Sequence, residues 1–196
     1  MKTLLIGGAR SGKSSLAALW ANERSNDVCC VVTATASDPE MSARIEAHRR
    51  ERPAHWRIRE EAVRLAPIVA DHGAQRRAKG AANGPLLLID CLTLWTANCL
   101  WSPDSTGKAP ADAAGWVADL ARWRAERDDL LVAVRDFRGE MILVSNEVGT
   151  GIVPENAAAR LFRDEQGWLN QAVAAECDEV FLVAAGLPLR MKPNQC

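Results

Sequence analysis

A glycine-bearing loop between an apolar run and a helical segment constrains the fold of this chain most. Leu4, Leu5 and Ile6 form the apolar run, and the residues from Gly7 onward read GGARSGKS. This is the G-x4-G-K-[ST] spacing of a phosphate-binding loop, in which consecutive backbone N–H groups converge on one anion. Glycine suits the tight points of such a loop because it has no Cβ. The spacing predicts a strand, a nucleotide-phosphate site and a helix, in that order.

Individual residues of this loop have separate expected roles. Lys13 would contact the β- and γ-phosphates as a point charge, and the Ser14 hydroxyl would ligate Mg²⁺. A flexible Gly/Ser linker is the alternative interpretation, and it fits poorly because the loop follows directly on an apolar strand. We expect nucleotide contacts from the whole loop, namely from Gly7, Gly8, Ala9, Arg10, Ser11, Gly12, Lys13 and Ser14.

Length and composition limit the class of protein. We expect residues 1–196 to form a single domain, because this length suits one large core. A formal net charge of −1 gives no general attraction to nucleic acid, so we expect no nucleic-acid partner. The chain has no signal-peptide pattern and no apolar run near eighteen residues, and we expect no membrane span and a cytoplasmic location. Six cysteines without C-x-x-C spacing predict buried thiols in a reducing cytosol.

Apolar runs alternate with helical segments along the chain. This alternation predicts an α/β fold, a single doubly wound P-loop domain whose sheet is mostly parallel with an antiparallel C-terminal edge strand. The expected strands after the first are 28–33, 57–60, 85–90, 141–145 and 179–184, and we expect 186–192 to form a turn and the antiparallel edge strand. The expected helices are 15–23, 39–51, 61–71, 91–101, 111–135 and 156–176, and we expect an exposed loop at 72–84.

A carboxylate ends one of the buried strands. The segment from Leu86 reads LLLID and ends at Asp90. In P-loop enzymes the second nucleotide strand has this form, and its acid holds the Mg²⁺ shell. A strand that ends in Asp is common, but the phosphate loop upstream favours the functional interpretation, so Ser14 and Asp90 are the predicted metal ligands.

A polar loop with two glycines, 146–156, follows the strand at 141–145. Ligands of parallel α/β folds bind at the carboxyl ends of strands, so this loop is a candidate for the site. An ordinary strand-to-helix turn is the alternative.

The helix expected at 39–51 carries a histidine among arginines. His48 shares a face with Arg44, while Arg49, Arg50 and Arg52 follow at the end of the helix, where the dipole favours cations. From position alone, a solvated helix with an ordinary histidine explains this pattern.

Four segments together resemble the family of bifunctional adenosylcobinamide kinases / adenosylcobinamide-phosphate guanylyltransferases of cobalamin biosynthesis. The resemblance runs nearly from end to end. It lies in GGARSGKS at 7–14, DPEMSARIEAHRRERPAHW at 38–56, NEVGTGIVPEN at 146–156 and GWLNQ at 167–171.

The resemblance implies two reactions. The first transfers a γ-phosphoryl group from ATP or GTP to adenosylcobinamide, and the second transfers GMP from GTP to adenosylcobinamide phosphate through a GMP-histidine intermediate. The histidine of that intermediate matches His48, and a homotrimer is also implied. The implied nucleotide contacts outside the phosphate loop are Thr33, Ala34, Arg49, Arg50, Glu51, Arg52, Glu60 and Asp90.

The residues are consistent with the chemistry that the resemblance implies. A neutral imidazole is a competent nucleophile, and the arginines around His48 would favour its neutral form. His55 is the fallback nucleophile, and we expect His72 to be solvated. The general base of the kinase step, Asp90 or Glu147, stays open. So do two alternative functions: a P-loop small-molecule kinase without guanylyl transfer, and a GTP-binding regulatory module.

Overall fold

The computed structural model describes residues 1–35, 39–79, 85–101 and 118–193. At positions 40, 44, 48, 51 and 75–79 it describes the helical backbone but not the side chain. The elements in chain order are β1 (Lys2–Gly7), α1 (Lys13–Arg24), β2 (Val28–Val32), α2 (Pro39–Glu51), β3 (Arg57–Glu60), α3 (Leu65–Lys79), β4 (Leu86–Asp90), α4 (Leu92–Trp101), α5 (Leu120–Asp136), β5 (Met141–Asn146), α6 (Ala157–Glu176), β6 (Glu179–Ala184) and β7 (Leu187–Lys192).

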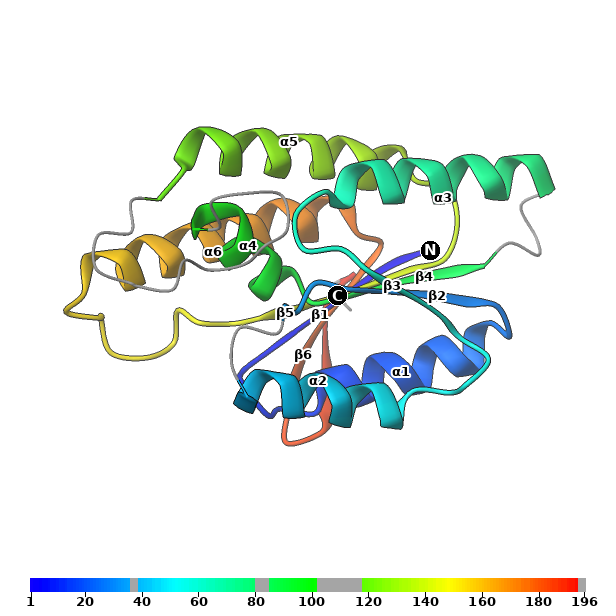
Figure 1. Cartoon of the computed structure of the whole chain (residues 1–196), viewed down its shortest axis with the longest axis horizontal. Helices are drawn as coiled ribbons and strands as arrows, with labels where there is room; N and C mark the ends of the chain where they lie inside the picture. The colour runs from blue at the N-terminus through cyan, green and yellow to red at the C-terminus, as the bar shows by residue number, and fades with distance from the viewer. Residues whose placement is uncertain (36–38, 80–84, 102–117, 194–196) are drawn as a thin grey trace.

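A seven-stranded sheet lies at the centre of the described chain, in the order β3-β2-β4-β5-β1-β6-β7. Every pairing is parallel except β6 with β7, which is the antiparallel C-terminal edge. In Figure 1, α3, α4, α5 and α6 lie on one side of the sheet, and α1 and α2 lie on the other. The predicted doubly wound α/β fold is therefore confirmed.

Both faces of the central strands are buried. In β1, Leu4 packs into a core with α3, α4, α5 and α6, while Leu5 packs into a second core with α1. Successive side chains of a strand point to opposite faces, so a sheet covered on both sides needs apolar residues at every position. This explains the continuous apolar runs in β2 and β4.

The helix α3 differs from its prediction at both ends. It begins at Leu65 rather than residue 61, because the Glu61 carboxylate accepts hydrogen bonds from the N–H groups of Val63 and Arg64 just before the helix. Pro67 therefore falls in the first turn, where its missing N–H costs no hydrogen bond. The predicted loop at 72–84 was wrong up to residue 79, since the helix continues to Lys79.

His72 is buried, so the prediction that it is solvated was wrong. Its side chain belongs to α3 and is 5% exposed, with Nε2 3.1 Å from the carbonyl oxygen of Pro85. The ring also stacks on Phe137, with 6.3 Å between the ring centroids. Gly73 approaches the same phenylalanine, since a Cβ at Gly73 would lie 3.5 Å from its ring. The small, polar composition of this segment concealed a helix that packs closely against the end of α5.

The helix α5 begins at Leu120, with Asp119 as its N-cap. The N-terminal part of the predicted helix, 111–117, lies outside the described residues. Trp123 is fully buried, and its Nε1–H donates to the Glu165 carboxylate at 2.7 Å.

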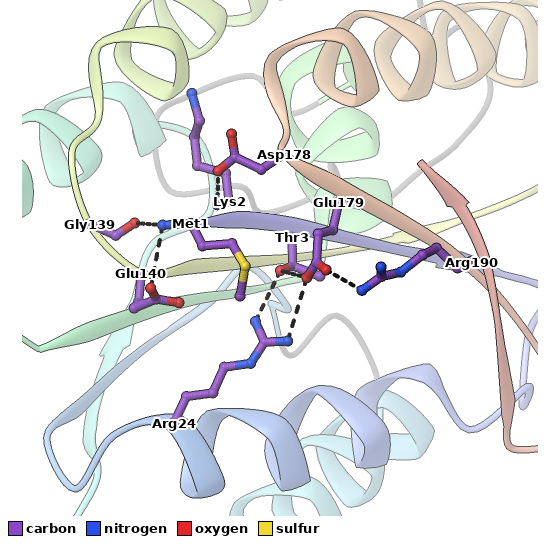
Figure 2. Close-up of polar contacts among 9 residues, drawn as sticks. All are labelled: Met1, Lys2, Thr3, Arg24, Gly139, Glu140, Asp178, Glu179 and Arg190. Carbon is purple, nitrogen blue, oxygen red and sulfur yellow. Dashed lines mark hydrogen bonds and ion pairs between the residues drawn. The ribbon is translucent and has the colours of Figure 1, made fainter. Parts of the chain in front are cut away.

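An ionic cluster joins several elements at the amino ends of the strands (Figure 2). The Glu179 carboxylate lies between Arg24 of α1, at 3.8 Å, and Arg190 of β7, at 2.5 Å. Arg24 also donates to the Thr3 hydroxyl at 3.0 Å. These contacts tie α1, β1, β6 and β7 together at this edge of the sheet. Among the described residues no helix combines the length and apolar character needed to cross a membrane.

Candidate active site

Four strands end side by side at the carboxyl edge of the sheet. In register, Gly7 of β1 pairs with Asn146 of β5, and Val32 of β2 pairs with Asp90 of β4. A cavity of about 460 Å³ opens at this edge. Its lining residues are Ala9, Arg10, Ser11, Gly12, Lys13, Ser14, Ser15, Val32, Ala34, Met41, Ile45, Arg52, Asp90, Cys91, Leu94 and Asn146.

The backbone of the phosphate loop requires glycine at two points. A Cβ at Gly7 would lie 2.4 Å from the carbonyl oxygen of Val183, so no larger residue fits without a shift of β6. Gly12 has φ +92°, a conformation that glycine adopts readily. The turn between β6 and β7 supports the loop, because the N–H of Gly186 donates to the Ser11 carbonyl at 2.8 Å. The strand–loop–helix order predicted from the spacing is observed.

Lys13 lies at the first position of α1 and is 7% exposed. Its ammonium donates to the Gly8 carbonyl at 3.0 Å, across the loop. Burial lowers the pKa of Lys13 below its ordinary value, and the nearby Cys91 and Asp90 side chains oppose that shift. An anion in the loop would stabilise the charged ammonium, which is the electrostatic arrangement expected of a phosphate site.

Asp90 is the centre of the polar contacts in the cavity. The Ser14 hydroxyl donates to Asp90 Oδ1 at 3.3 Å, and the Arg52 guanidinium donates to Oδ2 at 3.1 Å. The side chains of Arg52 and Asp90 are only 10% and 16% exposed, so this pair is less screened by water than a surface pair. A residue beyond the end of α2 is thereby tied to the end of β4.

Ser14 and Asp90 form a donor set that fits Mg²⁺. Magnesium prefers oxygen ligands and usually takes one or two protein groups together with waters and phosphates. The described residues contain no group of three or more His, Cys, Asp or Glu side chains that could hold a metal by themselves. A magnesium ion here would therefore depend on nucleotide phosphates for the rest of its ligands.

Thr33 and Ala34 follow β2 but have different environments. Ala34 lines the cavity. Thr33 is fully buried, and its hydroxyl donates to the Cys91 carbonyl at 2.6 Å and accepts from the Cys91 N–H at 3.0 Å. Thr33 therefore holds the backbone just after Asp90 in place.

The helix α2 flanks the cavity through Met41 and Ile45, which are half-buried. Arg49 pairs with Glu60 of β3 at 2.8 Å, and Arg50 pairs with Glu46 at 3.4 Å; none of these four residues lines the cavity. The side chains of Arg44, His48 and Glu51 lie outside the described residues, and His55 is exposed beyond the end of the helix.

The loop after β5 is tied back to the phosphate loop. The Glu147 N–H donates to the Gly7 carbonyl at 3.0 Å. The Glu147 carboxylate accepts from the Gly149 N–H in its own loop, whereas Asp90 lines the cavity.

Several cavity residues were not predicted from the sequence. Met41, Ile45, Cys91 and Leu94 are apolar and read as ordinary helix or strand positions, which leaves no chemical signal. Asn146, in contrast, belongs to the loop 146–156 that the sequence made a candidate for the site. Burial raises the pKa of the Cys91 thiol to about 11, so this group is neutral at physiological pH.

Residues 3–191 match the family model described as cobinamide kinase / cobinamide phosphate guanyltransferase. The chain is 43% identical to the bifunctional adenosylcobalamin biosynthesis protein CobP of Pseudomonas aeruginosa over 192 residues, which cover 98% of each chain. It is 37% identical to the bifunctional adenosylcobalamin biosynthesis protein CobU of Escherichia coli K12, with 98% of this chain and 100% of that protein covered.

Among solved structures, the chain is similar to an ATPase from the type III secretion system of pathogenic bacteria, with a TM-score of 0.53 and 13% identity. That match covers 96% of this chain and 56% of the other, and it supports the fold alone. The family description names a kinase and a guanyltransferase, and both act on nucleotides, which a phosphate loop suits. The chain therefore belongs to the cobinamide kinase / cobinamide phosphate guanyltransferase family.

Proposed function

We propose that this transferase first phosphorylates adenosylcobinamide and then attaches GMP to the product. In the first step a hydroxyl oxygen of the corrinoid bonds to the γ-phosphorus of ATP or GTP, and the bond to the β–γ bridging oxygen breaks. In the second step GMP passes from GTP to adenosylcobinamide phosphate. The observation that carries the proposal is that the phosphate loop, Asp90 and two residues of α2, Met41 and Ile45, line the same cavity.

Magnesium is part of the proposal, with Ser14 and Asp90 as the protein groups that would hold it. When bound, the ion would supply positive charge that offsets the negative charge developing on the phosphate oxygens. The Ser14 hydroxyl and the Asp90 carboxylate are already within 3.3 Å of each other. Arg52, which pairs with Asp90 in this structure, is a second cation at the same place and could bind phosphate oxygens.

His48 is the proposed nucleophile of the guanylyl transfer. Its imidazole nitrogen would bond to the α-phosphorus of GTP while pyrophosphate leaves, and the phosphate oxygen of the corrinoid would then displace the histidine. The support comes from α2: positions 41, 45 and 48 have the spacing of one helix face, and Met41 and Ile45 line the cavity. The arginines at 49 and 52 would favour neutral imidazole.

Labelling with GTP that carries a radioactive α-phosphate tests this proposal. The native chain, incubated with Mg²⁺ and then denatured, is expected to keep a label that acid removes and base does not. His48→Ala should lose the label, while His55→Ala, the matched control from the same segment, should keep it. Both variants should still phosphorylate adenosylcobinamide from γ-labelled nucleotide.

The labelling pattern separates the candidate functions. Label that persists in His48→Ala would show that another residue is the nucleophile. A native chain that phosphorylates the corrinoid but takes no label would be a kinase without guanylyl transfer. Nucleotide binding without either reaction would favour a GTP-binding regulatory module.

The proposed assembly is a homotrimer. Large apolar side chains are exposed in the loop after β5, on α6 and on the edge strand β7, where three of them lie at alternate positions and so share one face of the strand. These side chains are Ile152, Val153, Trp168, Leu187, Leu189 and Met191. Light scattering after size exclusion should give about three times the chain mass of 21.3 kDa, and a monomer mass at micromolar concentration would contradict the proposal.

A cytoplasmic location is also proposed. Within the part of the chain that the structure describes, five cysteines are free thiols, and four of them are buried. Such thiols suit a reducing compartment.

A further inference from the structure

A buried polar cluster lies beneath the carboxyl end of β5. Ser145 and Gln166 are fully buried and Asn170 is 5% exposed, beside an apolar core. Gln166 donates to the Ser145 hydroxyl at 2.8 Å and to Asn170 Oδ1 at 3.0 Å, and Ser145 donates to the same Oδ1 at 2.6 Å. Burying polar side chains costs free energy, so a connected cluster of this kind calls for a role that apolar packing could not fill.

The cluster ends on the backbone of Asn146. Asn170 Nδ2 donates to the Asn146 carbonyl at 3.0 Å, and the Asn146 N–H donates to the Thr93 hydroxyl at 2.7 Å. The next N–H, that of Glu147, donates to the Gly7 carbonyl. Hydrogen bonds to three elements, α6, α4 and β1, therefore fix the main chain of residues 146 and 147.

Asn146 lines the cavity at the carboxyl edge of the sheet. Because neighbouring side chains of a strand alternate in direction, Ser145 packs toward α6 while Asn146 lines the cavity with Ser14 and Asp90. Asn146 Oδ1 is buried and has no hydrogen-bond partner among the described residues. Buried polar atoms are normally paired, so an acceptor without a partner at a ligand cavity indicates that its donor arrives with the ligand.

We propose that Asn146 orients the hydroxyl group that attacks the γ-phosphorus, and that Thr93 and Asn170 are positioning residues for it. Phosphate oxygens are acceptors and cannot pair with Oδ1, whereas an alcohol O–H can. The alcohol oxygen bonds to the γ-phosphorus, the nucleoside diphosphate leaves, and the proton passes to the general base of the kinase step. The carboxamide takes no proton, because its oxygen is far too weak a base. This inference rests on the proposed kinase function.

The first test compares native chain with Asn146→Ala in phosphoryl transfer to adenosylcobinamide. We expect kcat/KM for the corrinoid to fall roughly 100-fold, since misplacement of a reacting atom by 1 Å can cost about that much. Nucleotide affinity, measured separately, should change by less than about twofold, because Oδ1 contacts no phosphate oxygen. Thermal melting curves of the two chains without nucleotide show whether Asn146→Ala is folded.

The second test uses a matched pair at Thr93. Thr93→Val keeps the shape of the side chain but removes the acceptor for the Asn146 N–H, and Thr93→Ser restores it. We expect Thr93→Val to lower kcat/KM for the corrinoid, and we expect Thr93→Ser to have a kcat/KM close to that of the native chain. Nucleotide affinity should be unchanged in both variants. Gln171→Ala, at an exposed position next to Asn170, is the control variant and should behave as native chain.

The outcomes separate this inference from the kinase proposal. A native chain that transfers no phosphoryl group refutes the kinase function itself. An active native chain with an equally active, folded Asn146→Ala refutes the role of Asn146. A parallel loss of nucleotide affinity and of turnover also refutes it, because the donor would then be water on the nucleotide's metal ion. Equal activity of Thr93→Val and Thr93→Ser refutes the positioning role.

Discussion

Single residues of the cavity have properties that their neighbours impose. Cys91 follows the carboxylate of Asp90 and shares the cavity with Lys13. Burial, and then the negative charge of Asp90, raises the pKa of the Cys91 thiol, while burial lowers that of the Lys13 ammonium. Both shifts disfavour the charged form, as expected where water is largely excluded.

The raised pKa of Cys91, about 11, predicts slow alkylation. At pH 8 roughly one thiol in a thousand is thiolate, the reactive form, so iodoacetamide should label Cys91 far more slowly than free cysteine. The rate should rise roughly tenfold per pH unit up to about pH 10, because the thiolate fraction rises by that factor. Peptide mass spectrometry measures the labelling, and Cys91→Ser identifies the peptide.

Bound GTP should slow this labelling further, because Cys91 lines the proposed nucleotide cavity. Rapid modification at pH 8 would contradict the buried environment of the thiol. A rate that saturating nucleotide leaves unchanged would contradict the placement of the nucleotide in this cavity.

Helices with clear end signals could be predicted, and helices without them could not. Asn156 caps α6 by accepting the N–H groups of Ala158 and Ala159, and both ends of α6 agree with the prediction. The helix α3 has no such signal, and its second half contains a glycine whose place is set by contact with Phe137. The length of α3 therefore depends on its contacts with α5, which is distant in the sequence.

Gly167 lies in the middle of α6, where a Cβ would meet nothing within 4 Å. Gly167→Ala should raise the free energy of unfolding by about 0.5–1 kcal/mol, because alanine loses less backbone entropy in a helix. Urea denaturation of the two chains measures the difference. A destabilised variant would indicate that this face of α6 needs the glycine for contact with another subunit.

On the scale of the whole molecule, the carboxyl and amino ends of the strands carry different features. The carboxyl edge holds the cavity, and the amino edge holds the cluster of Glu179, Arg24 and Arg190, which joins α1, β6 and β7 (Figure 2). The turn from β6 to β7 also supports the phosphate loop through Gly186. The C-terminal strands therefore stabilise the site from a distance in sequence.

Glu179→Gln should destabilise the whole fold by about 1–3 kcal/mol, since it leaves the partly buried Arg24 guanidinium and the more exposed Arg190 guanidinium without their carboxylate. Chemical denaturation measures this change. Asp27→Asn, which breaks the exposed pair with Arg57, is the control and should cost less than about 1 kcal/mol. Equal effects of the two substitutions would show that the Glu179 cluster contributes no more than a surface pair.

The sequence by itself determined the local parts of this protein: the phosphate loop, the apolar strands, the end of β4 at Asp90 and the antiparallel edge. Each of these depends on neighbouring residues, through spacing, strand alternation or glycine conformation. Only the tertiary structure decided that Arg52 pairs with Asp90, that His72 is buried and that Ser145, Gln166, Asn170 and Thr93 hold Asn146. These contacts join residues 13 to 65 positions apart in the chain, and no local pattern encodes which distant partner a polar side chain meets.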